Sequence, residues 1–440
     1  MTDIIFSFDT EDFTSKKAAD AILKEAEILR KEGVTGCFCL VGHLADQLVA
    51  WKRDDVLRAL SFHEIHNHSL GHSLHPTINE YTDIPDANEA IARVLEQESL
   101  ANEKIRAATG TERIYAAVPP GNSKSYAAMY AYAKMGIPIY ADSVCDTNTS
   151  SGAYYCNIFN TKYTVSFESL FLNGKNTDVA ALLDKLSSLE RAIIYTHPNI
   201  ATHKEWWDGI NYKGENKHPF GKWEACIERD EDETERFYAS IRDLVRRIKN
   251  DSRFRITSYK ELARELENEG ERTVRKSDIP SIKASLEKRF YPISSPVSLS
   301  IADIMLTARD ILLGAHEHRC ASVYGFLDIP YGVKKETRLT ADDIISAAND
   351  IKDREFLPSR LMAGSVAIGP ADWLFAALDV ILGKKEVLIS PKDQLPSFNE
   401  LPELRDMTLK NSWIHSPDFK DEYLSQRLRL QAYTLRFRAK

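Results

Sequence analysis

The chain has 440 residues, 43% hydrophobic and 28% charged, which is the balance of an ordinary soluble protein with a sizeable core. Its 57 Lys and Arg residues are outnumbered by 65 Asp and Glu residues, for a net charge of −8, and this argues against nucleic-acid binding. The start MTDIIFSFD lacks the pattern of a signal peptide, and no apolar stretch approaches about 18 residues, so we expect a cytoplasmic protein without a membrane partner.

Short apolar runs alternate with helical segments in the first part of the chain. The expected strands are residues 4–8, 37–41, 64–68, 113–118, 137–141, 164–169, 191–196 and 253–257. Amphipathic stretches lie between them, for example at 16–33 and 87–110. Strands that alternate with helices indicate βα units and a parallel sheet. About seven or eight such units predict an α/β fold of the (β/α)-barrel kind over residues 1–268.

The character of the chain changes after the polar stretch ENEGERTVRKSDIPS. We expect a linker at 269–281 and a smaller, mainly helical domain at 282–440. Three similar stretches in that domain each open an apolar-periodic helix with an Ala-Asp pair, and they cover 298–312, 337–351 and 366–382. Capping residues of this kind favour a helix start. We interpret the stretches as repeated helical hairpins, and we expect the final run DEYLSQRLRLQAYTLRFRAK to pack back onto one domain.

The six cysteines include no CxxC pair, so we expect free thiols rather than a zinc site built on them. Cys37 and Cys39 alternate with Phe38, which is typical of a buried strand.

The first motif with chemical potential is FSFDTED, where an apolar strand ends in Asp9, Glu11 and Asp12. The carboxyl ends of barrel strands carry the active site, so these acids are placed for chemistry. In an extended chain Glu11 shares a face with Asp9, whereas a turn beginning at Thr10 presents Asp12 instead. Both remain candidates.

The second motif is HEIHNHSLGHSLHP, which holds five of the chain's 12 histidines. His68 and His72 are four residues apart and follow a strand, so both imidazoles can reach one ion. Two histidines and one carboxylate form a common divalent-metal set with open positions for water and substrate. We expect His63, His66 and His75 to shape or border the pocket, and His316 and His318 to lie in a solvated turn.

With these motifs the chain resembles the NodB-like polysaccharide deacetylases, carbohydrate esterase family 4, over about residues 1–265. The family pattern HEIxNH[ST]xxH is matched by HEIHNHSLGH, and later motifs have counterparts in AVPPG, YADS and IIYTHP. The resemblance implies a distorted seven-stranded barrel. The C-terminal stretches weakly resemble pseudomurein-binding-type repeats.

The resemblance implies a role for each matched residue. Asp9 is the catalytic base, His197 is the general acid, and Asp142 orients or tunes that histidine. The metal ligands are His68, His72 and either Glu11 or Asp12. Zn²⁺ is the expected ion, with Co²⁺, Ni²⁺, Mn²⁺ and Fe²⁺ as alternatives. A backbone N–H near Pro120–Gly121 helps to hold the oxyanion.

The chain departs from the family at Ala117, where an Arg usually fixes the base. Lys124 and Lys204 are candidates for a replacement cation. Another difference is the loop EWWDGINYKGEN, in which Trp206, Trp207 and Tyr212 would suit stacking on sugar faces or packing over the barrel end.

The resulting hypothesis is a metal-dependent hydrolase that removes an acyl group, acetyl in the first instance, from an amide nitrogen of a sugar or another small substrate. One alternative is an allantoinase-like hydrolase of cyclic amides. A second is an iron enzyme with two histidines and a carboxylate, and a third is a non-catalytic carbohydrate-binding protein. The C-terminal repeats would bind a ligand or form the interface of a homo-oligomer.

Overall fold

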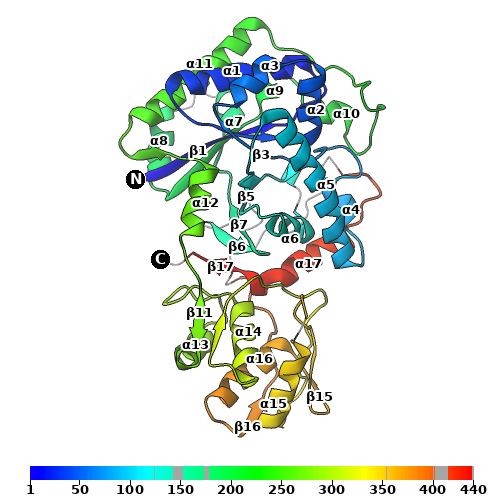
Figure 1. The fold of residues 1–440 in the computed structure, drawn as a ribbon, viewed down its shortest axis with the longest axis vertical. Coiled ribbons are helices and arrows are strands. Elements are labelled where there is room, and N and C mark those ends of the chain that lie inside the picture. The colour runs from blue at the N-terminus through cyan, green and yellow to red at the C-terminus, as the bar shows by residue number, and fades with distance from the viewer. Residues whose placement is uncertain are drawn as a thin grey trace.

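The computed structural model describes residues 1–122, 124–141, 152–172, 178–352, 354–399, 401 and 415–438. The molecule has a larger N-terminal part and a smaller C-terminal part, and the last helix lies between them (Figure 1). Among the described residues, no helix is long and apolar enough to cross a membrane.

The N-terminal part is built on one curled sheet of eleven strands, in the order β17-β6-β7-β5-β4-β3-β2-β1-β9-β8, with β10 also paired to β1. Neighbours from β5 to β8 are parallel, and β6 and β17 are antiparallel additions. The strands are β1 Thr2–Thr10, β2 Cys37–Leu40, β3 Glu64–Asn67, β4 Ala116–Ala117, β5 Ile139–Ala141, β6 Ala153–Tyr155, β7 Ile158–Thr161, β8 Val165–Ser166, β9 Arg191–Thr196, β10 Phe254–Ile256 and β17 Arg436–Phe437. This confirms the expected α/β architecture of the (β/α)-barrel kind. The described strands leave the sheet open between β8 and β17.

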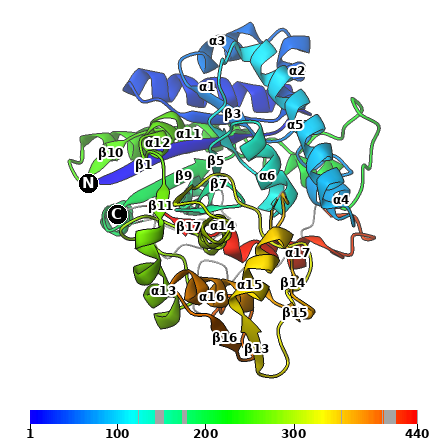
Figure 2. The same cartoon turned by 60° about the horizontal axis from the view of Figure 1, so that its bottom comes forward.

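Helices cover the outside of this sheet (Figures 1 and 2). They are α1 Lys16–Glu32, α2 Gly42–Ala50, α3 Asp54–Leu60, α4 Ile78–Thr82, α5 Ala87–Thr109, α6 Tyr126–Lys134, α7 Phe167–Phe171, α8 Val179–Ser187, α9 Pro198–Thr202, α10 Trp207–Asn211, α11 Glu231–Asn250 and α12 Tyr259–Glu267. The bounds of α1 and α5 were predicted well, because each helix has a capping residue at its start and a glycine at its end. Ser15 caps the first turn of α1, and Gly33 ends it in the left-handed conformation at φ 66°.

In the described residues of the C-terminal part, four helices pack against three two-stranded antiparallel sheets. Its elements are β11 Thr273–Arg275, α13 Ile279–Lys288, α14 Ile301–Leu312, β12 Glu317–Arg319, β13 Thr337–Thr340, α15 Ala341–Ala347, β14 Leu361–Ala363, β15 Val366–Ile368, α16 Pro370–Ile381 and β16 Glu386–Ile389. Helices α14, α15 and α16 begin where the repeats predicted them. The helical-hairpin interpretation is wrong, however, since strands separate these helices, and much of the predicted linker forms β11 and the start of α13.

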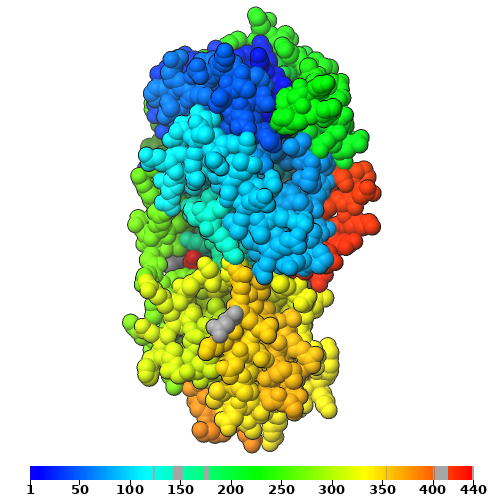
Figure 3. Space-filling view, turned by 45° about the vertical axis from the view of Figure 1, so that its right-hand side comes forward, coloured from blue at the N-terminus to red at the C-terminus, as the bar shows by residue number. Residues whose placement is uncertain are grey.

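The last described segment packs back onto the N-terminal part, as expected. Helix α17 (Leu424–Leu430) places Leu424 and Leu428 in the same hydrophobic core as the barrel helices, while Leu430 and Tyr433 belong to the core of the C-terminal part. The segment therefore joins both parts, and the space-filling view shows it along the side of the larger one (Figure 3).

Candidate metal and catalytic site

The acids of FSFDTED lie at the carboxyl end of β1, in the middle of the sheet. Asp9 pairs in register with Cys39 of β2, and Glu11 follows the strand by one residue. Both carboxylates are at least 96% buried. Burial raises the pKa of Asp9, against the lowering effect of His68 and His197. Burial also opposes charge on Glu11, but the neighbouring imidazoles lower the pKa of Glu11 well below its ordinary value.

Glu11, His68 and His72 form the only cluster that combines both predicted metal histidines with a carboxylate among the described residues. One ligand atom from each lies within 4.8 Å of the others. The Glu11 Oε2 atom is 2.8 Å from His72 Nε2 and 3.4 Å from His68 Nε2. A divalent ion prefers two imidazoles and a carboxylate of this kind. Residues at these three positions therefore fit a metal ion.

Asp12 is not part of this cluster. Its Oδ1 atom accepts hydrogen bonds from the backbone and hydroxyl of Thr14, at 2.8 and 2.6 Å. Burial raises the pKa of Asp12 to about 7. The sequence left Glu11 and Asp12 as alternative metal ligands. Glu11 is the one that faces the histidines, and Asp12 closes the turn before α1.

The far ring nitrogens of both histidines meet hydrogen-bond acceptors. His68 Nδ1 lies 3.0 Å from the carbonyl of Val118, which can only accept, so this nitrogen carries the hydrogen. Ser73 donates to Asp208 at 2.9 Å and is 2.7 Å from His72 Nδ1, so its oxygen accepts from that ring. In the neutral tautomer each Nε2 then presents a lone pair to the cluster, as a metal ligand requires.

The loop that carries His72 is strained and heavily bonded. Ser69 and His72 both have left-handed backbone conformations, at φ 70° and 52°, which is uncommon for residues with a side chain. Asn67 accepts from the Ser69 backbone at 2.7 Å, and Ser69 Oγ accepts from the His72 backbone at 2.9 Å. These bonds hold the His72 ring against Glu11.

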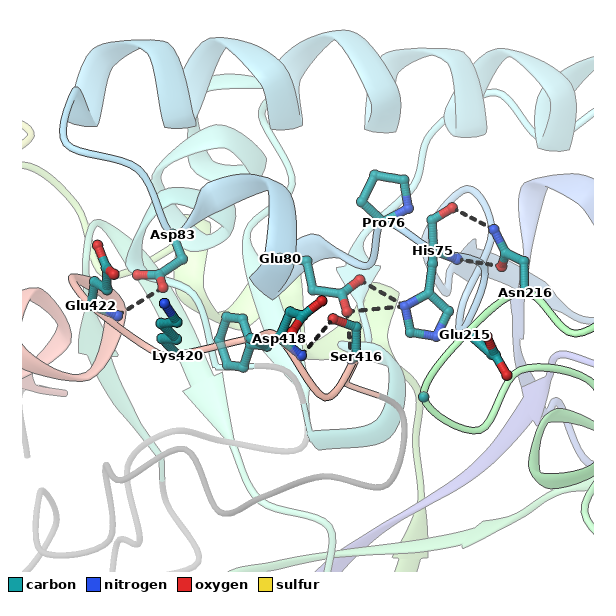
Figure 4. A pocket seen from close by; sticks show the side chains of 12 residues that line it. His75, Pro76, Glu80, Asp83, Glu215, Asn216, Ser416, Asp418, Lys420 and Glu422 are labelled. Carbon is teal, nitrogen blue, oxygen red and sulfur yellow. Dashed lines mark hydrogen bonds and ion pairs between the residues drawn. The ribbon is translucent and has the colours of Figure 1, made fainter.

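The other histidines of this motif have structural positions. His63 lies 2.9 Å from the carbonyl of Ala26 and accepts from Gly36. His75 contacts the Glu80 carboxylate at 2.9 Å and the carbonyl of Tyr212 at 2.9 Å. Glu80 also accepts from the backbone of Ser416, so His75 and Glu80 join the His72 loop to the C-terminal segment beside a cavity of about 680 Å³ (Figure 4).

A second group of potential metal ligands lies near the start of β2 and β3 and consists of Cys37, Glu64 and His66. One ligand atom from each of these residues lies within 4.8 Å of the other two. Here the far nitrogen of the histidine, Nδ1, accepts from the backbone N–H of Tyr115 at 3.4 Å. His66 Nε2 must then carry the hydrogen, which it donates to Glu64 at 3.3 Å. Burial raises the pKa of the Cys37 thiol well above its ordinary value, so the thiol keeps its proton, and Glu64 Oε2 accepts from both Cys37 and His66.

His197 directly follows β9 and lies beside Asp9. Its Nε2 is 3.6 Å from Asp9 Oδ2, and its Nδ1 is 3.1 Å from Glu168 Oε1. Burial opposes charge on the imidazole, but Glu168, with Glu11 and Asp9 nearby, raises the pKa of His197 to about 10. At neutral pH the ring is therefore protonated and can donate from Nε2.

Glu168 makes the kind of contact with His197 that the resemblance implied for Asp142. The structure does not describe Asp142. Glu168 was missed because TVSFES alternates like a strand, whereas α7 begins at Phe167 after the cap residue Ser166. Thr196 also donates to Glu168, at 2.8 Å.

Tyr163 contacts Asp9, the carboxylate that the resemblance expects an Arg to fix. Its hydroxyl donates to Asp9 Oδ1 at 2.6 Å, and Ala117 is fully buried on β4. Lys204 pairs with Glu233 at 3.0 Å and is therefore not the replacement cation. A neutral hydroxyl thus fixes Asp9, and nothing in the sequence around Tyr163 indicated this contact.

The aromatic loop after His197 divides into packing and exposed residues. Trp207 and Tyr212 are buried, and Trp207 Nε1 donates to Glu11 Oε1 at 2.9 Å. The idea that they stack on sugar faces is therefore wrong in this conformation. Trp206 is 43% exposed and lies 4.8 Å from the His197 ring, edge to face. The role expected of Pro120–Gly121 stays a prediction.

His318, predicted to lie in a solvated turn, is instead buried on β12 and paired with Asp310 of α14. His316 is exposed. The five described cysteines, Cys37, Cys39, Cys156, Cys226 and Cys320, are thiols outside any disulfide bond, as expected.

No family profile matches this chain, and no curated protein matches it. Among solved structures, the chain is similar to a CE4 family pseudoenzyme from Bacillus anthracis, at 15% identity over 60% of this chain and 66% of that one, with a TM-score of 0.33. A family 4 carbohydrate esterase from Streptomyces lividans, in complex with acetate, matches at 14% identity over 58% and 91%, with a TM-score of 0.31. A 4-alpha-glucanotransferase from Thermococcus litoralis matches at 12% identity over 59% and 40%, with a TM-score of 0.39.

These structures include members of the family that the motifs resemble. They also include a pseudoenzyme and a transferase. The chain spans less than two thirds of the length of either of those two proteins. At these identities and TM-scores, the function has to be argued from the site itself.

Proposed function

We propose that this protein is a metal-dependent hydrolase that removes an acyl group, acetyl in the simplest case, from the amide nitrogen of a sugar or another small N-acylated compound. The observation that carries the proposal is the arrangement of Asp9 and His197 beside the buried set of Glu11, His68 and His72. In this proposal Asp9 is the general base and His197 is the general acid. Both lie next to the three metal ligands at one edge of the sheet.

Glu11, His68 and His72 would hold the ion. When bound, a divalent ion polarises the acyl carbonyl and makes water acidic enough to attack near neutral pH. Zn²⁺ suits the two imidazoles and one carboxylate.

Asp9 accepts the proton that water loses as it attacks the carbonyl carbon. Its raised pKa brings the carboxylate closer to neutral pH, where a base is most effective. Tyr163 occupies Oδ1, so Oδ2 is the oxygen that takes the proton. His197 gives its Nε2 proton to the leaving nitrogen as the carbon–nitrogen bond breaks. The proton that Asp9 took from water can then transfer from Oδ2 to His197 Nε2, 3.6 Å away. This transfer restores the carboxylate and the protonated imidazole.

Trp206 supplies a ring beside the acid. Its exposed ring edge or face can pack against the apolar side of a sugar next to the scissile amide. A sugar substrate is therefore favoured within the proposal.

The test is release of acetate from a panel of N-acetylated sugars and small N-acetylated amines, with Asp9→Asn as the matched variant. We expect Asp9→Asn to keep its metal and lose about 10²–10⁴-fold in turnover. Turnover by Asp9→Asn at the level of the unmodified protein would exclude Asp9 as the base.

A further inference from the structure

The loop that carries His72 is not packed tightly on all sides. A cavity of about 290 Å³ is lined by residues 69–72 of this loop and by side chains of α4 and α5. Two loop residues, Ser69 and His72, have left-handed backbone conformations, which persist only where the surroundings hold them. Because the protein does not pack against the loop at the cavity, hydrogen bonds have to fix the backbone on this side.

One buried carboxylate bonds the loop from α5. Glu98 is 1% exposed. Its Oε1 atom accepts a hydrogen bond from the backbone N–H of Leu70 at 3.2 Å, and its Oε2 atom accepts from Asn67 Nδ2 at 3.1 Å. Among the described residues, Glu98 is the one side chain from outside the motif HEIHNHSLGHSLHP that bonds the backbone of residues 68–72.

The start of α2 and Glu98 hold different groups of the same stretch of backbone. The carbonyls of Ser69 and Leu70 accept from the backbone N–H groups of Gly42 and His43, at 2.9 and 3.0 Å. The N–H of Leu70 is bonded by Glu98 instead. Without this acceptor, a backbone donor in the middle of a strained loop would lack its partner, and such a loss is costly. The loop would then shift toward another arrangement of its donors.

Asn67 connects the same carboxylate to both left-handed residues. Its Oδ1 atom accepts from the Ser69 backbone at 2.7 Å, and Ser69 Oγ accepts from the His72 backbone at 2.9 Å. The Tyr132 hydroxyl lies 3.0 Å from Glu98 Oε2 and 3.3 Å from Asn67 Oδ1. A continuous series of hydrogen bonds therefore runs from Glu98 to the backbone of a metal ligand.

We propose that Glu98 is a positioning residue of the metal site, and that it acts by accepting hydrogen bonds from Leu70 and Asn67. These bonds fix the backbone that presents His68 and His72 to the ion. What the loop requires is the acceptor, not the charge of the carboxylate. The inference rests on the metal site within the proposed function, but not on the reaction or on the substrate.

Two neutral variants separate the acceptor from the charge. In Glu98→Gln the side-chain carbonyl still accepts from Leu70, and the amide donates to the Tyr132 oxygen once that hydroxyl turns to Asn67. Glu98→Met keeps the length of the side chain and a high helix propensity, but it offers no oxygen to the loop. Both variants remove the charge, so they differ in the hydrogen bonds alone.

The experiment measures the Zn²⁺ affinity of the full chain by competition with a chromogenic chelator. We expect Glu98→Met to bind Zn²⁺ about 10–100-fold more weakly than the unmodified protein, and Glu98→Gln to stay within about threefold of it. The control is Asp372→Leu, because Asp372 is a fully buried carboxylate that accepts from the backbone of Val333 and Gly369 in the C-terminal part. It should lower the midpoint of urea unfolding and leave the Zn²⁺ affinity unchanged.

Equal Zn²⁺ affinity in Glu98→Met and Glu98→Gln would overturn the proposal, whatever their stabilities, because a merely structural role changes unfolding alone. A second measurement needs no variant, namely hydrogen exchange of the Leu70 amide in the metal-free, unmodified protein. We expect this amide to be protected, and exchange at the rate of an open amide would also overturn the proposal. A selective loss of affinity in Glu98→Met supports it even where no N-acetylated compound is hydrolysed, so this inference and the proposed reaction fail separately.

Discussion

Two clusters of potential metal ligands lie along the same neighbouring strands and differ in their outer hydrogen bonds. In the cluster of Glu11, His68 and His72, the far ring nitrogens face a carbonyl and a serine oxygen. In the cluster of Cys37, Glu64 and His66, the far nitrogen faces a backbone N–H. The first arrangement leaves lone pairs for an ion, and the second places a hydrogen where the ion would bind.

The comparison shows that ligand types and spacing are not sufficient for a metal site. The first cluster is fully buried, the second is buried except at Glu64, and both bring their ligand atoms within 4.8 Å. The two clusters differ in the hydrogen-bond partner of the histidine ring nitrogen that points away from the cluster. That partner determines which of the two ring nitrogens carries the hydrogen. Mutations that change the clusters separately should therefore have unequal effects.

The largest expected effect comes from removing the histidines of the first cluster. His68→Ala with His72→Ala should reduce bound metal from about one ion per chain to none and lower turnover by more than about 100-fold. His66→Ala with Cys37→Ser should leave the metal content unchanged. Metal analysis by mass spectrometry after gel filtration compares the two. Equal losses in both double variants would contradict the distinction.

Loss of the charge behind His197 should be the next largest effect. In Glu168→Gln the pKa of His197 should fall from about 10 toward its ordinary value near 6.5, so the protonated acid disappears at a lower pH. The alkaline limb of the pH profile of kcat/KM then moves down, and turnover at pH 9 drops about 100-fold while the metal stays bound. An unshifted alkaline limb would exclude Glu168 as the group that holds the proton on His197.

A smaller effect is expected from the outer partner of His72. Ser73→Ala removes the acceptor that faces Nδ1 and should weaken metal binding by about 10–100-fold, as measured by competition with a chelator. Ser61→Ala, an exposed serine that bonds only its own helix end, is the matched control. Unchanged affinity in Ser73→Ala would mean that the outer bond does not set the tautomer.

The smallest effect concerns the junction of the His72 loop with the C-terminal segment (Figure 4). Burial opposes charge on Glu80, but His75 and the backbone of Thr77 and Ser416 lower its pKa to about 2. A lowered pKa contributes stability that is fully present above the ordinary value near 4.5 and is lost as the pH falls toward 2.

Glu80→Gln should therefore reduce the free energy of unfolding by up to about 3 kcal/mol at pH 7 and by less at pH 3. Urea unfolding at both pH values measures this difference. A penalty of equal size at pH 3 and pH 7 would show that the charge of Glu80 is not the cause.

The sequence predicted the parts of the site that sit in one continuous motif. Asp9 lies at the end of a strand, and His68, His72 and His197 follow strands, whose apolar pattern is clear, so their places at the sheet edge could be inferred. The choice of Glu11 over Asp12 needed the turn at Thr14, whose backbone and hydroxyl both donate to Asp12 Oδ1 and hold this carboxylate outside the cluster.

Contacts made across long stretches of chain were not predictable. Tyr163 reaches Asp9 over 154 positions, and Ser73 reaches Asp208 over 135. The β6–β7 hairpin was also missed, because Cys156 and Asn157 form its turn with positive φ angles, 50° and 64°, in a stretch without glycine at the turn. In the C-terminal part, helix starts were visible from their capping residues, but the short strands between the helices carry little periodicity.

The most direct test of the account is a titration of the metal-free protein with Co²⁺, followed by absorption spectroscopy. We predict one equivalent of bound Co²⁺ with ligand-field bands of nitrogen and oxygen ligands and no thiolate-to-metal charge-transfer band. His66→Ala should leave this spectrum unchanged. A charge-transfer band that disappears in Cys37→Ser would place the ion in the other cluster and contradict the account.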